Sequence, residues 1–100
     1  MTIEETALDG KLQLNIEGKI DSISSSDFQD AVLKSFQKSN EIIINMEKVS
    51  YISSAALRAL TLGNKTAAAK GGKMTVINIP PCVSDVFRMT GFDKMLDIRQ

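Results

Sequence analysis

The stretch that decides the fold is residues 42–62, IIINMEKVSYISSAALRALTL. It opens with the β-branched run Ile42–Ile44, which is typical of a strand covered on both faces or nearly so. We expect a short loop over Glu47–Ser53, followed by an Ala-rich helix that starts at Ser54. That helix should stop at the pair Gly71-Gly72, because glycine commonly terminates helices. A buried strand followed by a helix predicts an α/β fold.

Four further strands are predicted on either side of this unit. Residues 11–17 alternate polar and apolar side chains without a break, which indicates a strand with one buried face. The preceding Asp9-Gly10 pair is a hairpin signal, so residues 2–7 should form an antiparallel edge strand. Residues 74–79 and 95–98 supply two more apolar segments of strand length. The sheet is therefore predicted to be mixed, with four to five strands.

Two further helices join these strands. Ser24 and Asp27 resemble an acidic capping box, and apolar residues at helical spacing continue from there to about Lys38. Downstream, Pro80-Pro81 suits a loop and a first helical turn, and Gly91 suits a helix C-terminus. The resulting order is β-β-α-β-α-β-α-β, a small α/β sandwich whose helices cross between parallel strands.

Composition limits the function as well as the size. The 100 residues are expected to form one domain, residues 1–100, and the 12 basic and 12 acidic side chains cancel, which disfavours direct nucleic-acid binding. The chain has no histidine, and its one cysteine, Cys82, is expected to be a small apolar filler, so no metal, cofactor or catalytic residue is predicted. The acidic N-terminus and the short apolar runs favour a cytoplasmic protein without membrane insertion.

Two local segments could carry function. The first is Gly18–Asp21, at the end of the alternating strand, and the second is Val49–Arg58, between the central strand and the Ala-rich helix. Ser54 is expected to cap this helix, which would place its hydroxyl at the positive end of the helix dipole. A phosphate there would find backbone N–H donors. Without further information, Ser54 is most simply a cap and Asp21 a turn residue.

Together, these two segments resemble the STAS domain of bacterial anti-sigma factor antagonists. In that family a Gly-x-x-Asp after the second strand precedes an Asp-Ser-Ser-Gly-Leu or Ile-Ser-Ser-Ala-Gly-Leu motif, and the resemblance spans residues 2–98. It implies that Ser54 is the phosphoacceptor and that Asp21 is the acidic residue beside it, needed for phosphorylation or partner binding. Ser53 replaces the commonest acidic residue and is a rival acceptor, while Ala56 replaces a frequent glycine. The implied partner-binding residues are Asp21, Ser53, Ser54, Ala55, Ala56 and Arg58.

The resemblance also implies a regulatory cycle. The unphosphorylated protein would bind an anti-sigma factor that is also a serine kinase, releasing a sigma factor; phosphorylation of Ser54 would end the binding, and a serine phosphatase would restore it. An alternative is a STAS docking subunit of a membrane transport or lipid-trafficking assembly, without a phosphorylation switch. A third is a small hydrolase using Ser54 with Asp21 or Lys19, for which the sequence displays neither a base nor an oxyanion hole.

Overall fold

The computed structural model of the chain describes residues 1–99. The elements are, in chain order, β1 (Thr2–Leu8), β2 (Lys11–Ile20), α1 (Ser25–Lys38), β3 (Glu41–Ile52), α2 (Ser54–Ala69), β4 (Lys73–Ile77), α3 (Pro81–Thr90), α4 (Phe92–Met95) and β5 (Asp97–Arg99). The predicted α/β order is confirmed, with the one-turn helix α4 added before the last strand. The prediction that the last strand begins at Met95 is wrong, because the αL residue Gly91 ends α3 and lets the chain start α4 at once.

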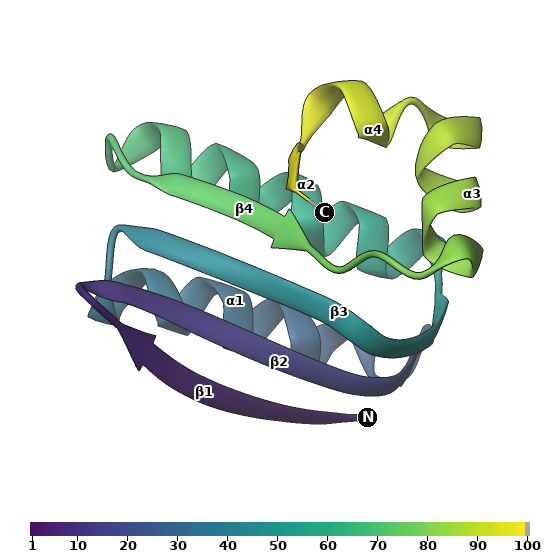
Figure 1. Cartoon of the computed structure of the whole chain (residues 1–100), viewed down its shortest axis with the longest axis horizontal. Helices are drawn as coiled ribbons and strands as arrows, with labels where there is room; N and C mark the ends of the chain where they lie inside the picture. Colours follow the sequence, from purple (N-terminus) through teal and green to yellow (C-terminus); the bar gives the residue numbers. More distant parts are fainter. Residues whose placement is uncertain (100) are drawn as a thin grey trace.

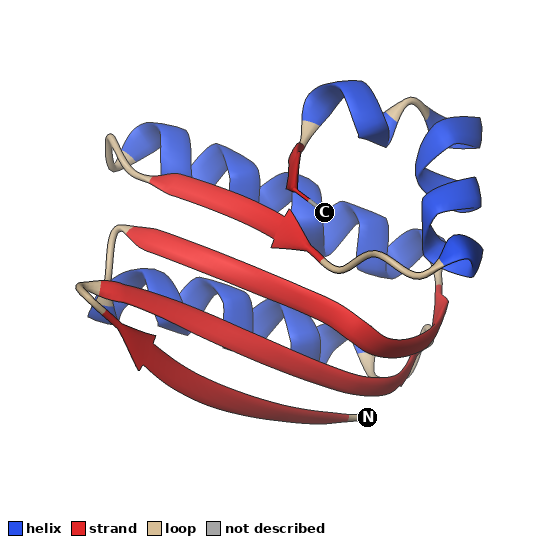
Figure 2. Cartoon of the chain, viewed as in Figure 1, coloured by secondary structure: helices blue, strands red, loops and turns tan. Residues whose placement is uncertain are grey.

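The five strands form one sheet in the order β1-β2-β3-β4-β5. β1 runs antiparallel to β2, as the hairpin signal predicts, and the other three pairings are parallel. The parallel connections run through helices, and α1 and α2 lie together behind the sheet in the view of Figures 1 and 2. The sheet is therefore mixed, with β3 at its centre.

The hydrophobic core lies between this sheet and the helices. Leu12, Leu14 and Ile16 of β2 point into it, and the stripe of α1 that meets them begins at the fully buried Phe28. The opposite face of the sheet is open, because alternate side chains of each strand point away from the core. Ile43 is consequently only half-buried. The prediction that the central strand is covered on both faces is wrong.

Strand β3 continues through the segment that the sequence predicts to be a loop. Asn15 pairs with Asn45, whereas Glu17 pairs with Lys48, so β3 supplies one more residue than β2 over this step. A second extra residue is inserted just before Tyr51. These two irregularities are β-bulges, which bend a strand and increase its twist.

The bulges explain why the loop prediction for Glu47–Ser53 fails. Each extra residue shifts the phase of the alternation, so that Val49 returns to the core at odd spacing from Met46, and Ile52 returns at odd spacing from Val49. A sequence pattern with period two therefore breaks, while the strand itself continues to Ile52. The bent end of β3 places the following residues beside the end of β2.

Candidate functional site

The candidate site lies at the carboxyl ends of the adjacent parallel strands β2 and β3. Their last residues, Ile20 and Ile52, are paired in the sheet, and the Ser53 N–H donates to the Ile20 carbonyl oxygen at 2.9 Å. Asp21 follows directly after one strand and Ser54 lies two residues beyond the other. The tertiary structure thus brings the two predicted segments to one edge of the sheet, where ligands and partners commonly bind in α/β folds.

Ser53, rather than Ser54, caps helix α2. The Ser53 side-chain oxygen accepts the Ala56 N–H at 3.2 Å, its backbone is extended, and the residue is only 8% exposed. The expectation that Ser54 is the cap is therefore wrong by one residue. A cap needs an extended backbone to turn its oxygen back onto the helix, and Ser54 is already the first helical residue.

Ser54 is exposed at the first position of a 16-residue helix. An α-helix leaves its first-turn N–H groups outside the intrahelical ladder, so those of Ser54 and Ala55 face the space in front of the helix. Ala55 is half-buried, while Ala56 is fully buried and unavailable to a partner. Arg58 is exposed one turn further along, at the i+4 spacing that places two side chains on the same helix face.

Asp21 organises the turn between β2 and α1. Its carboxylate accepts the N–H groups of Ile23 at 3.0 Å and Ser24 at 2.8 Å, and the Ser24 hydroxyl oxygen lies 3.0 Å away. The Ser24 N–H, followed by the Ser24 hydroxyl, lowers the pKa of the Asp21 carboxyl below its ordinary value of 3.8. No hydrogen bond joins Asp21 to Ser54 within residues 1–99, so the carboxylate serves its own turn in this state.

The capping box predicted from Ser24 and Asp27 is also wrong. Ser24 has helical backbone angles and makes no side-chain cap, and its hydroxyl oxygen instead accepts the Asp21 N–H at 3.0 Å. The same serine also lies within hydrogen-bond distance of the Lys19 carbonyl oxygen. The polar segment is thus a closed turn that holds Asp21 in place.

Two exposed apolar side chains lie next to this edge, and neither is among the site residues predicted from the sequence. Ile23 is 85% exposed at the centre of the Asp21 turn, and Tyr51 is 51% exposed on the bulged end of β3. The available signal for Ile23 was a lone apolar residue inside a serine-rich turn.

Cys82 is exposed, with its sulfur 3.6 Å from the Ser50 carbonyl oxygen, so its expected role as an apolar filler is wrong. It follows Pro81 on the outward side of the first turn of α3.

Residues 1–99 contain no group of three His, Cys, Asp or Glu side chains arranged to hold a metal ion. No helix in the same range is both long and apolar enough to cross a membrane. Two shallow hollows lie on the open face of the sheet instead of at Ser54. The edge that carries Ser54 is thus an exposed helix start flanked by apolar side chains.

The chain matches the sequence model of the STAS domain over residues 2–100. The chain belongs to the STAS domain family. A relative from Bordetella bronchiseptica, BtrV, is named as a candidate anti-sigma factor antagonist; it is 25% identical to this STAS domain over 93 residues, which are 92% of this chain and 80% of BtrV. The predicted resemblance is confirmed at the level of the family.

Solved structures share the fold of this STAS domain. A crystal structure of a candidate anti-sigma factor antagonist from Thermotoga maritima superposes with a TM-score of 0.91 at 19% identity, covering 98% of this chain and 86% of that one. The anti-sigma factor antagonist SpoIIAA of Bacillus superposes in its unphosphorylated form with a TM-score of 0.76 at 16% identity, covering 99% and 88%. Its phosphorylated form gives 0.75 at 17% identity, covering 99% and 92%. Anti-sigma factor antagonists are regulatory binding proteins and not enzymes.

Proposed function

We propose that this STAS domain is an anti-sigma factor antagonist that is switched by phosphorylation of Ser54. The observation that carries the proposal is the contrast between the two adjacent serines. The Ser53 oxygen is committed to the Ala56 N–H and the residue is 8% exposed, whereas Ser54 is exposed at the start of α2. A kinase needs a hydroxyl that it can reach, so Ser54 is the better acceptor. Phosphorylation of Ser53 would in addition destroy a helix cap.

The unphosphorylated domain binds its partner through the edge around Ser54. Ile23 and Tyr51 supply exposed apolar area there, and an aromatic side chain is a common anchor at protein interfaces. The turn holds the Asp21 carboxylate in place. The carboxylate can therefore accept further hydrogen bonds from a partner without losing more side-chain freedom. The partner is an anti-sigma factor with serine kinase activity, and its capture by this edge releases a sigma factor.

Phosphorylation ends the binding by adding charge in the middle of this surface. A phosphoserine carries about −1.5 to −2 charges at pH 7. In the free domain water screens it, and the helix dipole recovers about 0.3 to 2 kcal/mol. At an interface the same group is desolvated, and a mismatched charge costs several kcal/mol. The phosphate therefore blocks docking and leaves the domain folded.

Arg58 neutralises part of the phosphate charge in the free domain. It lies on the same face of α2 as Ser54, one turn toward the C-terminus, where an arginine can pair with a phosphate. The pairing stabilises the phosphorylated state in water and withdraws Arg58 from any partner that uses it. The side chain is thus available to the partner in one state and engaged by the phosphate in the other.

The remaining parts of the cycle follow from this assignment. A serine phosphatase removes the phosphate and restores binding. Kinase, phosphatase and sigma factor act in the cytoplasm, where this domain works as well. Its balanced charge of 12 basic and 12 acidic residues agrees with control of transcription without contact to DNA.

The test uses the chain with Ser54→Ala or Ser54→Asp as bait in lysate of the source cells, followed by mass spectrometry. The Ala variant should retain an anti-sigma factor kinase that the Asp variant loses. The purified kinase with ATP should then add one phosphate to the wild-type chain, and peptide mapping should place it on Ser54. Ser53→Ala, which keeps Ser54, should still be phosphorylated.

Three outcomes contradict the proposal. Equal retention of a membrane transport or lipid-trafficking subunit by both baits would identify a constitutive docking domain. Modification of Ser53 alone would refute the assigned acceptor. Hydrolysis of ATP or an ester by the isolated chain, lost in Ser54→Ala, would identify an enzyme.

A further inference from the structure

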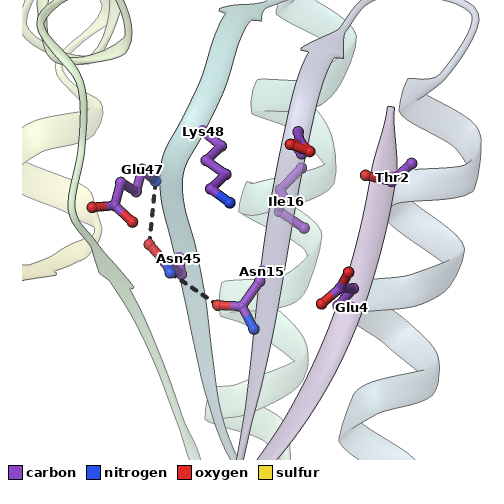
Figure 3. Close-up of a pocket in the computed structure, with 8 residues that line it drawn as sticks. Thr2, Glu4, Asn15, Ile16, Asn45, Glu47 and Lys48 are labelled. Carbon is purple, nitrogen blue, oxygen red and sulfur yellow. Dashed lines mark hydrogen bonds between the residues drawn. The ribbon is translucent and has the colours of Figure 1, made fainter.

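The open face of the sheet carries a cluster of unpaired acidic side chains at one corner. A hollow of about 220 Å³ lies there, lined by residues of β1, β2 and β3 (Figure 3). We call Glu4, Glu17 and Glu47 the acidic corner; Lys48 is the one cation among the residues lining the hollow. Within residues 1–99 none of these three carboxylates is part of an ion pair. The corner therefore carries net negative charge toward solvent.

The diagonally opposite corner of the same face is basic. A second hollow of about 290 Å³ lies between the starts of β2, β3 and β4 and the edge strand β5. We call Lys11, Lys73 and Arg99 the basic corner; Glu41 also lines the hollow. The Asp97 carboxylate lies 3.4 Å from the Lys73 ammonium and 3.0 Å from the Arg99 guanidinium. This corner keeps net positive charge after that pairing.

Between the two corners runs a row of amide side chains that hydrogen-bond to one another. The Asn15 oxygen accepts from Gln13 at 2.8 Å and from Asn45 at 2.9 Å. The Asn45 oxygen accepts the Glu47 N–H at 3.2 Å (Figure 3). It also accepts an amide N–H of Asn78 at 3.2 Å. Covering polar groups that already have partners costs far less than burying unsatisfied ones.

We propose that two copies of this STAS domain associate through their open sheet faces. A two-fold axis that lies between the two faces, perpendicular to the line that joins the two corners, turns one copy over onto the other and exchanges these corners. It therefore sets the acidic corner of each copy against the basic corner of the other, and makes this contact twice. Closed two-fold contacts of this kind are self-complementary, and they are the commonest form of homo-oligomer.

The dimensions of the face agree with such a contact. In Figure 1, which looks down the shortest axis, the strands lie across much of the view and α3 and α4 fill its upper right; the whole domain measures 30 by 26 Å in these two directions. That projected area is of the same order as the roughly 800 Å² per partner that a standard interface buries. Ile43 and Ile77 are half-buried on this face and supply its apolar part. The helices α1 and α2 lie on the other face, so Ser54 stays accessible in the dimer.

The first experiment measures the oligomeric state of the unmodified chain by sedimentation velocity. The dimer fraction should rise as the concentration increases from about 10 µM to about 1 mM, as mass action requires. At about 0.5 M salt, where screening shortens to a few Å, the dimer should weaken at least about tenfold. A monomer at every concentration in low salt overturns the proposal.

The second experiment locates the interface by reversing charges. Glu4→Lys with Glu17→Lys makes both corners basic, and Lys11→Glu with Lys73→Glu makes both acidic. Each double variant alone should be monomeric because like charges then meet twice. An equimolar mixture should form a one-to-one heterodimer, since opposite charges meet at both contacts. Variants that still form homodimers, or a mixture that stays monomeric, place the contact elsewhere and overturn the proposal.

A matched control separates this geometry from simple attraction between oppositely charged proteins. Asp27→Lys with Asp30→Lys, and Lys34→Glu with Lys65→Glu, give the same net charges on exposed positions of α1 and α2. These variants should each retain the wild-type homodimer, because the open face is unchanged. Equal heterodimer formation by the control mixture, together with loss of its homodimers, contradicts the proposed face.

Discussion

Replacing Ser53 by alanine should destabilise the domain, although an identical residue, Ser54, follows it directly. The substitution removes the oxygen that accepts the Ala56 N–H at 3.2 Å. Loss of a serine cap costs about 0.5 to 2 kcal/mol, and an unsatisfied buried donor about 1 to 3 kcal/mol. Because Ala56 is fully buried, water cannot replace the lost acceptor easily. We expect a loss of about 1 to 2 kcal/mol in the free energy of unfolding.

Two matched variants isolate the cap from other effects. Ser54→Ala should change the free energy of unfolding by less than about 0.5 kcal/mol, because Ser54 is exposed and forms no cap. Ser53→Asp should retain most of the stability, because a carboxylate at the cap also accepts the N–H and faces the positive helix end.

Urea unfolding followed by circular dichroism measures these differences. Thermal unfolding gives an independent check, since 1 kcal/mol corresponds to about 4 to 8 °C for a domain of this size. An unchanged midpoint for Ser53→Ala, or an equal loss for Ser54→Ala, would refute the assignment of the cap. It would also remove the structural reason for preferring Ser54 as the phosphoacceptor.

Gly72→Ala should cost more than about 3 kcal/mol of unfolding free energy, because the added Cβ would lie 2.0 Å from the Asn40 backbone oxygen. Gly71→Ala should cost only about 1 kcal/mol, because this position has open space around it and only its φ of +66° disfavours alanine. The free energy of unfolding should decline as the pH falls below about 4, because the lowered pKa of Asp21 favours the folded state only while the carboxyl is ionised. In acid unfolding curves, Asp21→Asn should make this decline shallower. Arg58→Gln should raise the second pKa of phosphorylated Ser54 by about 0.2 to 0.4 in ³¹P NMR titrations, and an unchanged value would exclude the pairing.

The sequence determined the order of the elements. Alternation over residues 11–17, the β-branched run Ile42–Ile44 and the glycine stops each report local backbone geometry, which short segments encode by themselves. The motif around Ser54 also identified the family that the comparison over residues 2–100 confirms. Periodicity failed over Glu47–Ser53, where the strand carries extra residues: the two bulges put β3 out of phase, and the sequence pattern predicted a loop where the strand continues.

Atomic roles within the site were decided by the tertiary structure. Ser53 and Ser54 are identical residues, and only the pairing of Ser53 with the Ile20 carbonyl oxygen fixes which one has the extended backbone that a cap requires. The sequence leaves open whether the Asp21 carboxylate contacts Ser54. In the structure it accepts the N–H groups of its own turn instead.

The arrangement of charged side chains on the sheet surface is harder still to predict from the sequence. Glu4 and Glu17 approach one another because β1 folds back antiparallel, and Lys11 joins Lys73 because β2, β3 and β4 begin at the same end of the sheet. The sequence by itself determined the elements and the family, since local patterns and motifs are properties of neighbouring residues. The cap, the fixed carboxylate and the two charged corners were decided by tertiary structure alone, because strand register sets which distant residues meet.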